Sequence, residues 1–164
     1  MSVPVVQLSG VKKSFGPVDV LKGVDLVAHP GRVTALVGDN GAGKSTLIKG
    51  LSGVQPYDSG QVLFEGQPVD ITSPRQAAAL GIEVVYQDLA LCENLDIVQN
   101  MFLGREEIGQ ATLDEASMEY QAAMALQSLS VKTVKSVRQK VSSLSGGQRQ
   151  TVAIARSVLR SAKI

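Results

Sequence analysis

The chain has 164 residues, of which 44% are hydrophobic, 4% aromatic and 19% charged, a composition typical of one globular domain. The formal net charge of +1 argues against a strongly basic surface for nucleic acid, and the single cysteine, Cys92, excludes an internal disulfide. No apolar run approaches the roughly 20 residues of a membrane-spanning helix, and the first residues do not resemble a secretory signal. We therefore expect a soluble domain located in the cytoplasm.

The first half of the sequence predicts alternating strands and helices. β-Branched and apolar runs predict strands, and an apolar stripe after a glycine-rich stretch predicts a helix. Ser73, Pro74 and Gly81 are the start and stop signals of a second helix. The predicted elements are strands over 5–11, 20–27, 32–37, 62–64 and 82–86, and helices over 44–51 and 74–80.

The second half predicts helices over 97–103 and 112–129, and Thr112 and Glu115 have the spacing of a capping box. Charges are segregated here: residues 88–119 include eight acidic residues and one basic residue. Residues 120–164 include eight basic residues and no acidic one. We expect two solvated faces that offset each other, and a patch that binds a partner stays open as the alternative.

A phosphate-binding motif lies between the predicted strand 32–37 and the helix 44–51. The segment Gly38-Asp-Asn-Gly-Ala-Gly-Lys-Ser45 matches the pattern G-x-x-x-x-G-K-[ST] at every fixed position. Glycines allow backbone N–H groups to form a concave anion site, and the following helix directs its first N–H groups at the same phosphates. Lys44 would neutralise phosphate charge, and the Ser45 hydroxyl would bind Mg²⁺. The sequence therefore predicts a site for a nucleoside triphosphate.

A second motif, Leu144-Ser-Gly-Gly-Gln148, opens a predicted helix with Val152 and Leu159 on one face. Ser145 and Gln148 have capping-box spacing, so this helix start is also suited to bind an anion. An ordinary helix cap would explain Ser145 but not the paired glycines.

With these two motifs the chain resembles the ATP-binding cassette (ABC) ATPases over nearly its whole length. The resemblance implies an α/β P-loop NTPase fold of ABC type, with an N-terminal antiparallel β subdomain and an α-helical subdomain. It implies ATP and Mg²⁺ as ligands, with Gln87 as a second Mg²⁺ ligand and Phe15 stacking on adenine; a core phenylalanine is the alternative for Phe15. The nucleotide-binding residues implied are Phe15, Gly38, Asp39, Asn40, Gly41, Ala42, Gly43, Lys44, Ser45 and Thr46.

In this family the second motif is the signature, which contacts ATP held by a partner cassette. Ser145, Gly146, Gly147 and Gln148 would accordingly face the nucleotide of a second subunit, most simply a second copy of the chain. The resemblance divides the chain into a β subdomain and P-loop core over 1–87, a Q-loop and helical subdomain over 88–144, and a signature helix over 145–164.

A narrower likeness appears in the segments 85–91 and 100–106, which resemble cassettes that drive uptake of simple sugars such as ribose, xylose or fructose. It implies that the helical segment 95–105 faces membrane permease subunits, at the inner face of the cell membrane. An extracytoplasmic sugar-binding protein would be an indirect partner, and no nucleic acid is expected.

The sequence departs from the family after the signature helix. No acidic residue follows Glu119, so the Walker B aspartate and the catalytic glutamate of the family have no counterpart, and His29 lies too early to be the switch histidine. In the family, the Walker B aspartate and the catalytic glutamate end a central strand of the sheet. Without that strand we expect an incomplete sheet, marginal folding and negligible ATP hydrolysis by this polypeptide alone. Two other functions stay open: a soluble cassette ATPase acting on nucleic acid or ribosomes, and a nucleotide-binding module that does not hydrolyse ATP.

Overall fold

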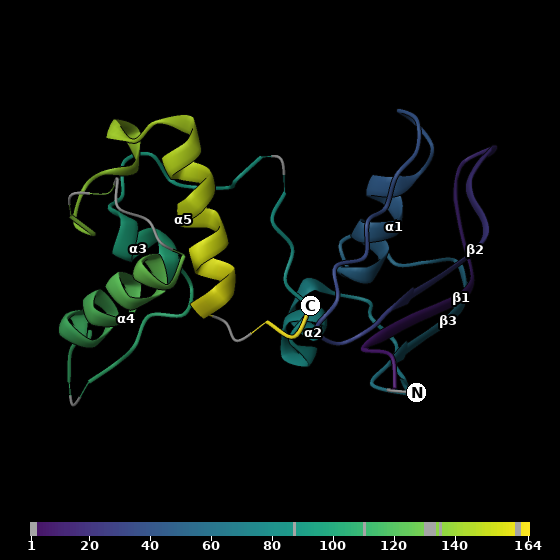
Figure 1. Ribbon diagram of the computed structural model, residues 1–164, viewed down its shortest axis with the longest axis horizontal. Coiled ribbons are helices and arrows are strands. Elements are labelled where there is room, and N and C mark those ends of the chain that lie inside the picture. Colours follow the sequence, from purple (N-terminus) through teal and green to yellow (C-terminus); the bar gives the residue numbers. More distant parts are fainter. Residues whose placement is uncertain (1–2, 87, 110, 130–133, 135, 160–161) are drawn as a thin grey trace. The chain divides into compact units, whose positions relative to one another are not determined.

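The computed structural model in Figure 1 describes residues 3–86, 88–109, 111–129, 134, 136–159 and 162–164. The chain forms two compact units. The first comprises Met1–Val84 with Lys163–Ile164, and the second comprises Val85–Ala162. Within the described residues no helix combines the length and the apolar character needed to cross a membrane.

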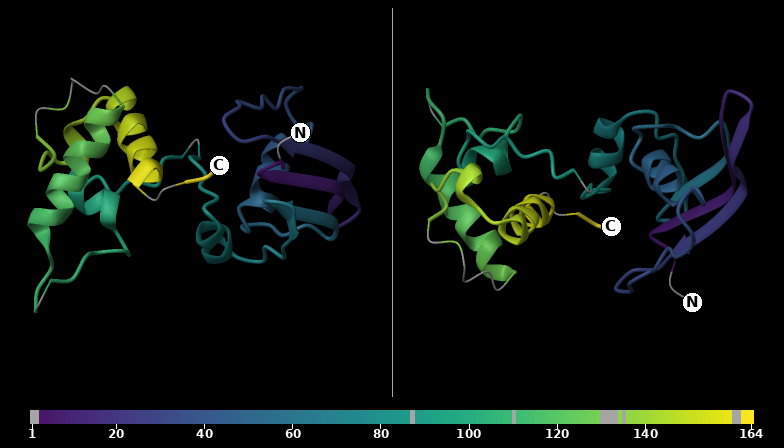
Figure 2. Two further views of the ribbon diagram at one scale, coloured as in Figure 1. Left: turned by 60° about the horizontal axis from the view of Figure 1, so that its bottom comes forward. Right: turned by 90° about the horizontal axis from the view of Figure 1, so that it is seen from above.

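The first unit contains a four-stranded antiparallel sheet in the order β2-β1-β3-β4, with helix α1 packed against it, as Figure 2 shows. Its core is formed by strand residues such as Val6 and Leu8 together with Leu47 and Leu51 of α1. The elements are β1 Val6–Phe15, β2 Val18–Ala28, α1 Lys44–Leu51, β3 Ser59–Phe64, β4 Gln67–Pro68 and α2 Pro74–Leu80.

The strand predicted over 5–11 is longer in the structure and continues to Phe15. Its pairing register with β2 shifts partway along. Val6 and Leu8 are buried at alternate positions, and the register then shifts between Leu8 and Val11, where Gly10 has a φ of 57°. This irregularity turns Val11 back into the core, and the strand continues toward the hairpin. Strict alternation therefore ends at the bulge, although the strand does not.

The predicted buried strands over 32–37 and 82–86 are wrong as regular strands. Residues 32–37 carry no strand assignment, and Val33 and Val37 are 99% and 84% exposed. No described segment pairs with 32–37, and an extended run becomes a strand only when a neighbour accepts its backbone hydrogen bonds. Around 82–86 the Glu83 N–H donates to Ile164 O at 3.0 Å, and the Lys163 N–H donates to Gly81 O at 2.8 Å.

The second unit is helical. Helices α3, α4 and α5 pack around a core that includes Ile97, Met118, Ala122 and Val152. The elements are α3 Ile97–Phe102, α4 Glu115–Ser128, the 3₁₀ turn η1 Val141–Ser143 and α5 Gly146–Leu159.

The predicted capping box at Thr112 is wrong. Helix α4 begins at Glu115, and the Asp114 carboxylate caps it by accepting a hydrogen bond from the Ser117 N–H at 3.0 Å. The Thr112 carbonyl instead accepts the Gly109 N–H at 2.8 Å, within a turn that is closed by a bridge between Ile108 and Leu113. This local turn takes up the residues that the capping-box spacing had placed in the helix.

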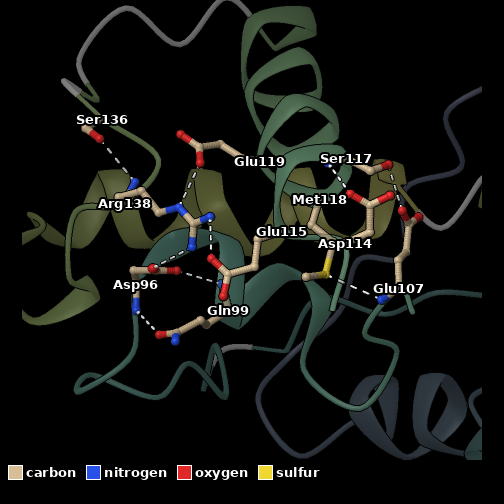
Figure 3. Close-up of polar contacts among 10 residues, drawn as sticks. All are labelled: Asp96, Gln99, Glu107, Asp114, Glu115, Ser117, Met118, Glu119, Ser136 and Arg138. Atoms are coloured by element: carbon tan, nitrogen blue, oxygen red, sulfur yellow. Dashed lines mark hydrogen bonds and ion pairs between the residues drawn. The ribbon is translucent and has the colours of Figure 1, made fainter. Parts of the chain in front are cut away.

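The segregated charges bond to each other inside the second unit. The Arg138 guanidinium contacts Glu119 at 2.9 Å, Glu115 at 3.0 Å and Asp96 at 3.6 Å, as Figure 3 shows. The hydrogen bond to Glu119 also raises the pKa of Arg138. One arginine from the basic segment therefore links the start of α3 to two turns of α4. These ion pairs neutralise some of the charges of the acidic and basic segments within the second unit.

Candidate functional site

The glycine-rich loop 38–43 is held in place by helix α1, which is fixed to the first unit at several points. Leu47 and Leu51 lie in the core, and the Tyr57 hydroxyl donates a hydrogen bond to Leu47 O at 2.6 Å. Burial raises the pKa of Tyr57. The Tyr57 ring lies so close to Gly50 that a Cβ there would fall 2.1 Å from a ring carbon, so only glycine fits. The loop before α1 is thus attached to a rigid helix.

The loop itself has the backbone geometry of an anion cradle. Gly41 and Gly43 have φ values of 87° and 85°, and Gly38 has a φ of 153°. Gly43 is the residue before α1, and a Cβ there would lie 3.0 Å from Leu21 and 3.2 Å from Val20 O. The left-handed conformation therefore favours glycine at 43, and the neighbours leave little room for a side chain immediately before the first N–H groups of the helix.

The start of α1 leaves backbone donors for a ligand. The first bond of the helix runs from the Leu47 N–H to Gly43 O at 2.9 Å, so the N–H groups of 44–46 precede it. The N-cap residue is Gly43, and no side chain caps the helix. These donors and the positive end of the helix dipole point toward the exposed loop, an arrangement that fits a phosphate group.

Lys44 supplies the positive charge of the cradle. Its ammonium donates to Gly38 O at 2.7 Å and to Asp39 O at 2.6 Å, so the side chain folds back over the loop. Both acceptors are backbone carbonyls, which a phosphate oxygen can replace as a charged and stronger partner. Lys44 therefore already lies where an anion in the loop would be neutralised.

The remaining predicted nucleotide residues lie around this cradle or near it in sequence. Asp39, Asn40, Ala42 and Ser45 are exposed, and Thr46 is half-buried in the first turn of α1. Phe15 ends β1 with 42% of its surface exposed and with the Lys13 ammonium 5.7 Å from the centre of its ring. The alternative of a core phenylalanine is therefore wrong, and the stacking role of Phe15 stays a prediction. Gln87 lies outside the described residues.

The signature residues open helix α5 in the second unit. The Gln148 N–H donates to the Ser145 hydroxyl at 3.3 Å, and the Ser145 N–H donates to the Gln148 side chain at 2.8 Å, which confirms the capping box. Gly146 and Gly147 are exposed, and a Cβ added at either would meet nothing within 4 Å. Neither has a positive φ, so the fold of the described chain does not itself require glycine there.

Sequence reasoning missed two tertiary contacts of the second unit, the buried hydrogen bonds of Asn100 and the ion pair of Glu93 with Arg149. Asn100 is completely buried and bonds to Cys92 through both its oxygen, at 2.7 Å, and its amide nitrogen, at 2.9 Å. Glu93 forms an ion pair with Arg149 at 2.7 Å. A polar residue inside the apolar pattern of 97–103 was the available signal for Asn100. Nothing local indicated the ion pair, whose members are 56 positions apart.

His29 and Cys92 are the only histidine and the only cysteine in the sequence. His29 is half-buried in the loop after β2, and Cys92 is half-buried with its backbone bonded to Asn100. Within the described residues no cluster of three or more histidine, cysteine or acidic side chains could hold a metal ion.

Comparison with known families finds one family model that contains both the cradle and the signature. The family model described as "ABC transporter" matches residues 21–164, which include both motifs. The chain belongs to the ABC transporter family. A xylose/arabinose import ATP-binding protein of Sulfolobus acidocaldarius is 47% identical over 98% of this ABC chain. A fructose import ATP-binding protein of Rhizobium meliloti is 44% identical over 98% of it. The chain spans 63% and 65% of the lengths of these two relatives.

Solved structures of ATP-binding cassettes share the fold of this ABC chain. A nucleotide-free cassette matches 97% of the chain with a TM-score of 0.80 and 25% identity. A cassette in its ADP conformation matches 99% with a TM-score of 0.81 and 26% identity. The predicted ABC fold class is therefore confirmed, with the antiparallel sheet and the helical unit both present.

Proposed function

We propose that the complete protein is the ATP-binding subunit of an ABC importer for a simple sugar, and that it couples ATP binding and hydrolysis to the membrane subunits. The observation that carries this proposal is the exposed cradle at 38–45, with glycine favoured at 43, uncapped helix N–H groups and an ammonium in place. Relatives named as xylose/arabinose and fructose import proteins support a sugar as the cargo.

The predicted nucleotide-binding residues would contact different parts of ATP or its Mg²⁺. The N–H groups of 44–46 would bind phosphate oxygens, and Lys44 would neutralise the phosphate charge. Ser45 and Gln87 would hold Mg²⁺, which draws charge from the phosphates when bound; a hydroxyl and an amide oxygen are the hard donors that this ion accepts. Phe15 would stack on adenine. This assignment gives each predicted residue one role that can be tested separately.

A second copy of the chain would complete each site. Ser145, Gly146 and Gly147 are exposed at the start of α5, where the helix presents N–H groups and lacks bulk. Glycines that are not needed for folding are expected where a ligand or a partner approaches the backbone closely. The signature of one copy would therefore contact the ATP held by the other, so that ATP binding closes the dimer and hydrolysis opens it.

The membrane subunits would dock on a groove of the second unit, at the cytoplasmic face of the membrane. This groove has a volume of about 220 Å³ and is lined mainly by apolar side chains. Glu106, Glu115 and Arg138 line it as well, and Arg138 is bonded to carboxylates. We expect the occupant to be a short cytoplasmic helix of the permease, apolar on one face and basic at its ends. The apolar lining residues are Leu95, Val98, Phe102, Leu103, Leu113 and Met118.

The replacement Leu103→Glu is expected to separate assembly from ATP binding. Leu103 is 46% exposed at the groove, so the change should alter stability by less than about 0.5 kcal/mol while placing a charge in the docking surface. Co-purification of the complete protein with its permease should fall at least tenfold, and ATP affinity should stay unchanged. Tyr120→Glu is the matched control because Tyr120 is 69% exposed on α4 and does not line the groove. Equal loss of permease in both variants would contradict this docking surface.

The proposed function is tested by reconstituting the complete protein with its membrane subunits and sugar-binding protein in vesicles. ATP should drive uptake of a labelled pentose or fructose, and uptake should stop when ATP is replaced by ADP. ATP binding without uptake of any simple sugar would overturn the choice of cargo. Failure to bind ATP would overturn the function itself.

A further inference from the structure

The segment that follows Gln87 lies along helix α5 and is bonded to it by two arginines. Arg149 and Arg156 are seven positions apart, and therefore lie on the same side of the helix. Arg156 donates to Leu89 O and Ala90 O, both at 3.4 Å, and Arg149 forms its ion pair with Glu93 at 2.7 Å. Ala90 has a φ of 47°, a conformation that costs free energy for a residue with a side chain. The segment 89–93 is thus held against the signature helix, with Ala90 in an unfavourable conformation.

Arg149 also fixes the turn that leads into the signature. Its Nε donates to Leu144 O at 3.2 Å, and one terminal nitrogen donates to Ser142 O at 3.2 Å. The Ser142 N–H in turn donates to Glu93 O at 3.0 Å. Glu93 therefore contacts this turn twice, by its carboxylate through Arg149 and by its carbonyl directly. The turn leads through Leu144 to Ser145 of the signature.

The exposure of the pair argues against a role in general stability. The Glu93 side chain is 65% exposed and that of Arg149 is 32% exposed. Ion pairs in such positions add little to folding because water screens them and both side chains lose freedom. The pair instead fixes the orientation of the Arg149 guanidinium, because that planar group bonds to one carboxylate and two carbonyls at once.

We propose that Glu93 is a positioning residue for the signature. Through Arg149 it sets the orientation of 142–145, and it makes the segment after Gln87 and the start of α5 move together. The proposal rests on the proposed function, because the orientation matters only if the signature contacts ATP in a second copy. A displacement of the segment after Gln87, the residue proposed to hold Mg²⁺ at one ATP, would then be carried to the surface proposed to contact the other ATP.

The test compares Glu93→Gln in the complete protein with Glu119→Gln as the matched control. Glu119 is 46% exposed and is paired with an arginine at 2.9 Å, but it does not touch the signature turn. Dimer formation with a non-hydrolysable ATP analogue is measured by analytical ultracentrifugation, and binding of the analogue to monomers is measured by calorimetry. Glu93→Gln should weaken the dimer up to about 25-fold, or about fivefold per signature, because an exposed pair reaches about that coupling.

Analogue binding to the monomer should stay unchanged in Glu93→Gln, because the cradle lies in the other unit. Melting temperature should stay within about 4 °C of the wild type, and Glu93→Asp, which keeps the charge, should recover most of the dimer affinity. Equal dimer affinity in Glu93→Gln and the wild type, or equal losses in Glu93→Gln and Glu119→Gln, would overturn the proposal. If Glu93→Gln fails to fold, Arg149→Lys decides, because it keeps the positive charge but loses the planar guanidinium that bonds to Glu93, Leu144 O and Ser142 O. Dimer affinity of Arg149→Lys equal to that of the wild type overturns the proposal. A wild type that binds no analogue would instead overturn the proposed function.

Discussion

The replacement Lys44→Ala is expected to weaken ATP binding by the complete protein about 100-fold and to lower its ATP turnover about 1,000-fold. The ammonium is the cation of the cradle and already bonds to Gly38 O and Asp39 O. A hydrogen bond to a charged group contributes about 1.5–3 kcal/mol, and loss of one donor to developing charge costs about 10²–10³ in rate. Calorimetric titration with ATP and a phosphate-release assay measure the two effects.

Lys49→Ala is the control for this prediction. Lys49 lies in the last turn of the same helix, and its removal takes away an equal charge without touching the cradle. ATP affinity and turnover of Lys49→Ala should remain within about twofold of the wild type, since a single charge at the other end of the helix changes little at such a distance. Unchanged ATP affinity in Lys44→Ala would contradict the assignment of 38–45 as the phosphate site.

The replacement Asn100→Leu is expected to destabilise the second unit by about 3 kcal/mol. Asn100 is completely buried, and its side chain bonds to the N–H and carbonyl of Cys92 and to the carbonyl of Asp96. Leucine has a similar volume but removes all three hydrogen bonds and leaves the Cys92 N–H without its acceptor, and a buried unsatisfied group costs about 1–3 kcal/mol. The carbonyls of Cys92 and Asp96 each keep one bond, from the N–H groups of Leu95 and Asn100. Hydrogen exchange read by mass spectrometry should show faster exchange across 85–129, while the first unit exchanges as before.

Gln99→Ala provides the comparison for Asn100. Gln99 is the neighbouring residue in α3, and its exposed side chain completes a capping box with Asp96. Its loss should cost about 1 kcal/mol, the usual contribution of a helix cap. If Asn100→Leu costs no more than Gln99→Ala, the buried bonds of Asn100 do not hold the second unit together.

The sequence predicted elements best where their signals are local. Helix α1 follows from the glycines before Lys44, and α2 follows from Ser73, Pro74 and the left-handed Gly81 at its end. The segments 32–37 and 82–86 could not be settled in the same way. Their apolar pattern describes what a strand would bury, but strand formation depends on a neighbour that a local pattern does not specify.

In the candidate site, too, the features with local signals were predicted and the tertiary contacts were not. The cradle and the signature were predicted because each is one continuous stretch whose glycines and polar residues have fixed spacing. The ion pair proposed to orient the signature is not continuous in the sequence, because Glu93 and Arg149 are 56 positions apart. The Arg138–Glu119 pair elsewhere in the second unit joins residues that are 19 positions apart. Such pairs follow only from tertiary packing, because any of several acidic residues could have met any of several arginines.

The open space around Gly146 and Gly147 has a consequence for attempts to improve this protein. Alanine is the stronger helix former by up to about 1 kcal/mol, and α5 has room for it at both positions. A laboratory selection for heat resistance would therefore favour alanine at the signature. The same change would add a methyl group on the surface proposed to meet a neighbour's nucleotide. Selection for thermal stability alone would then yield variants that fold well but no longer form the proposed dimer.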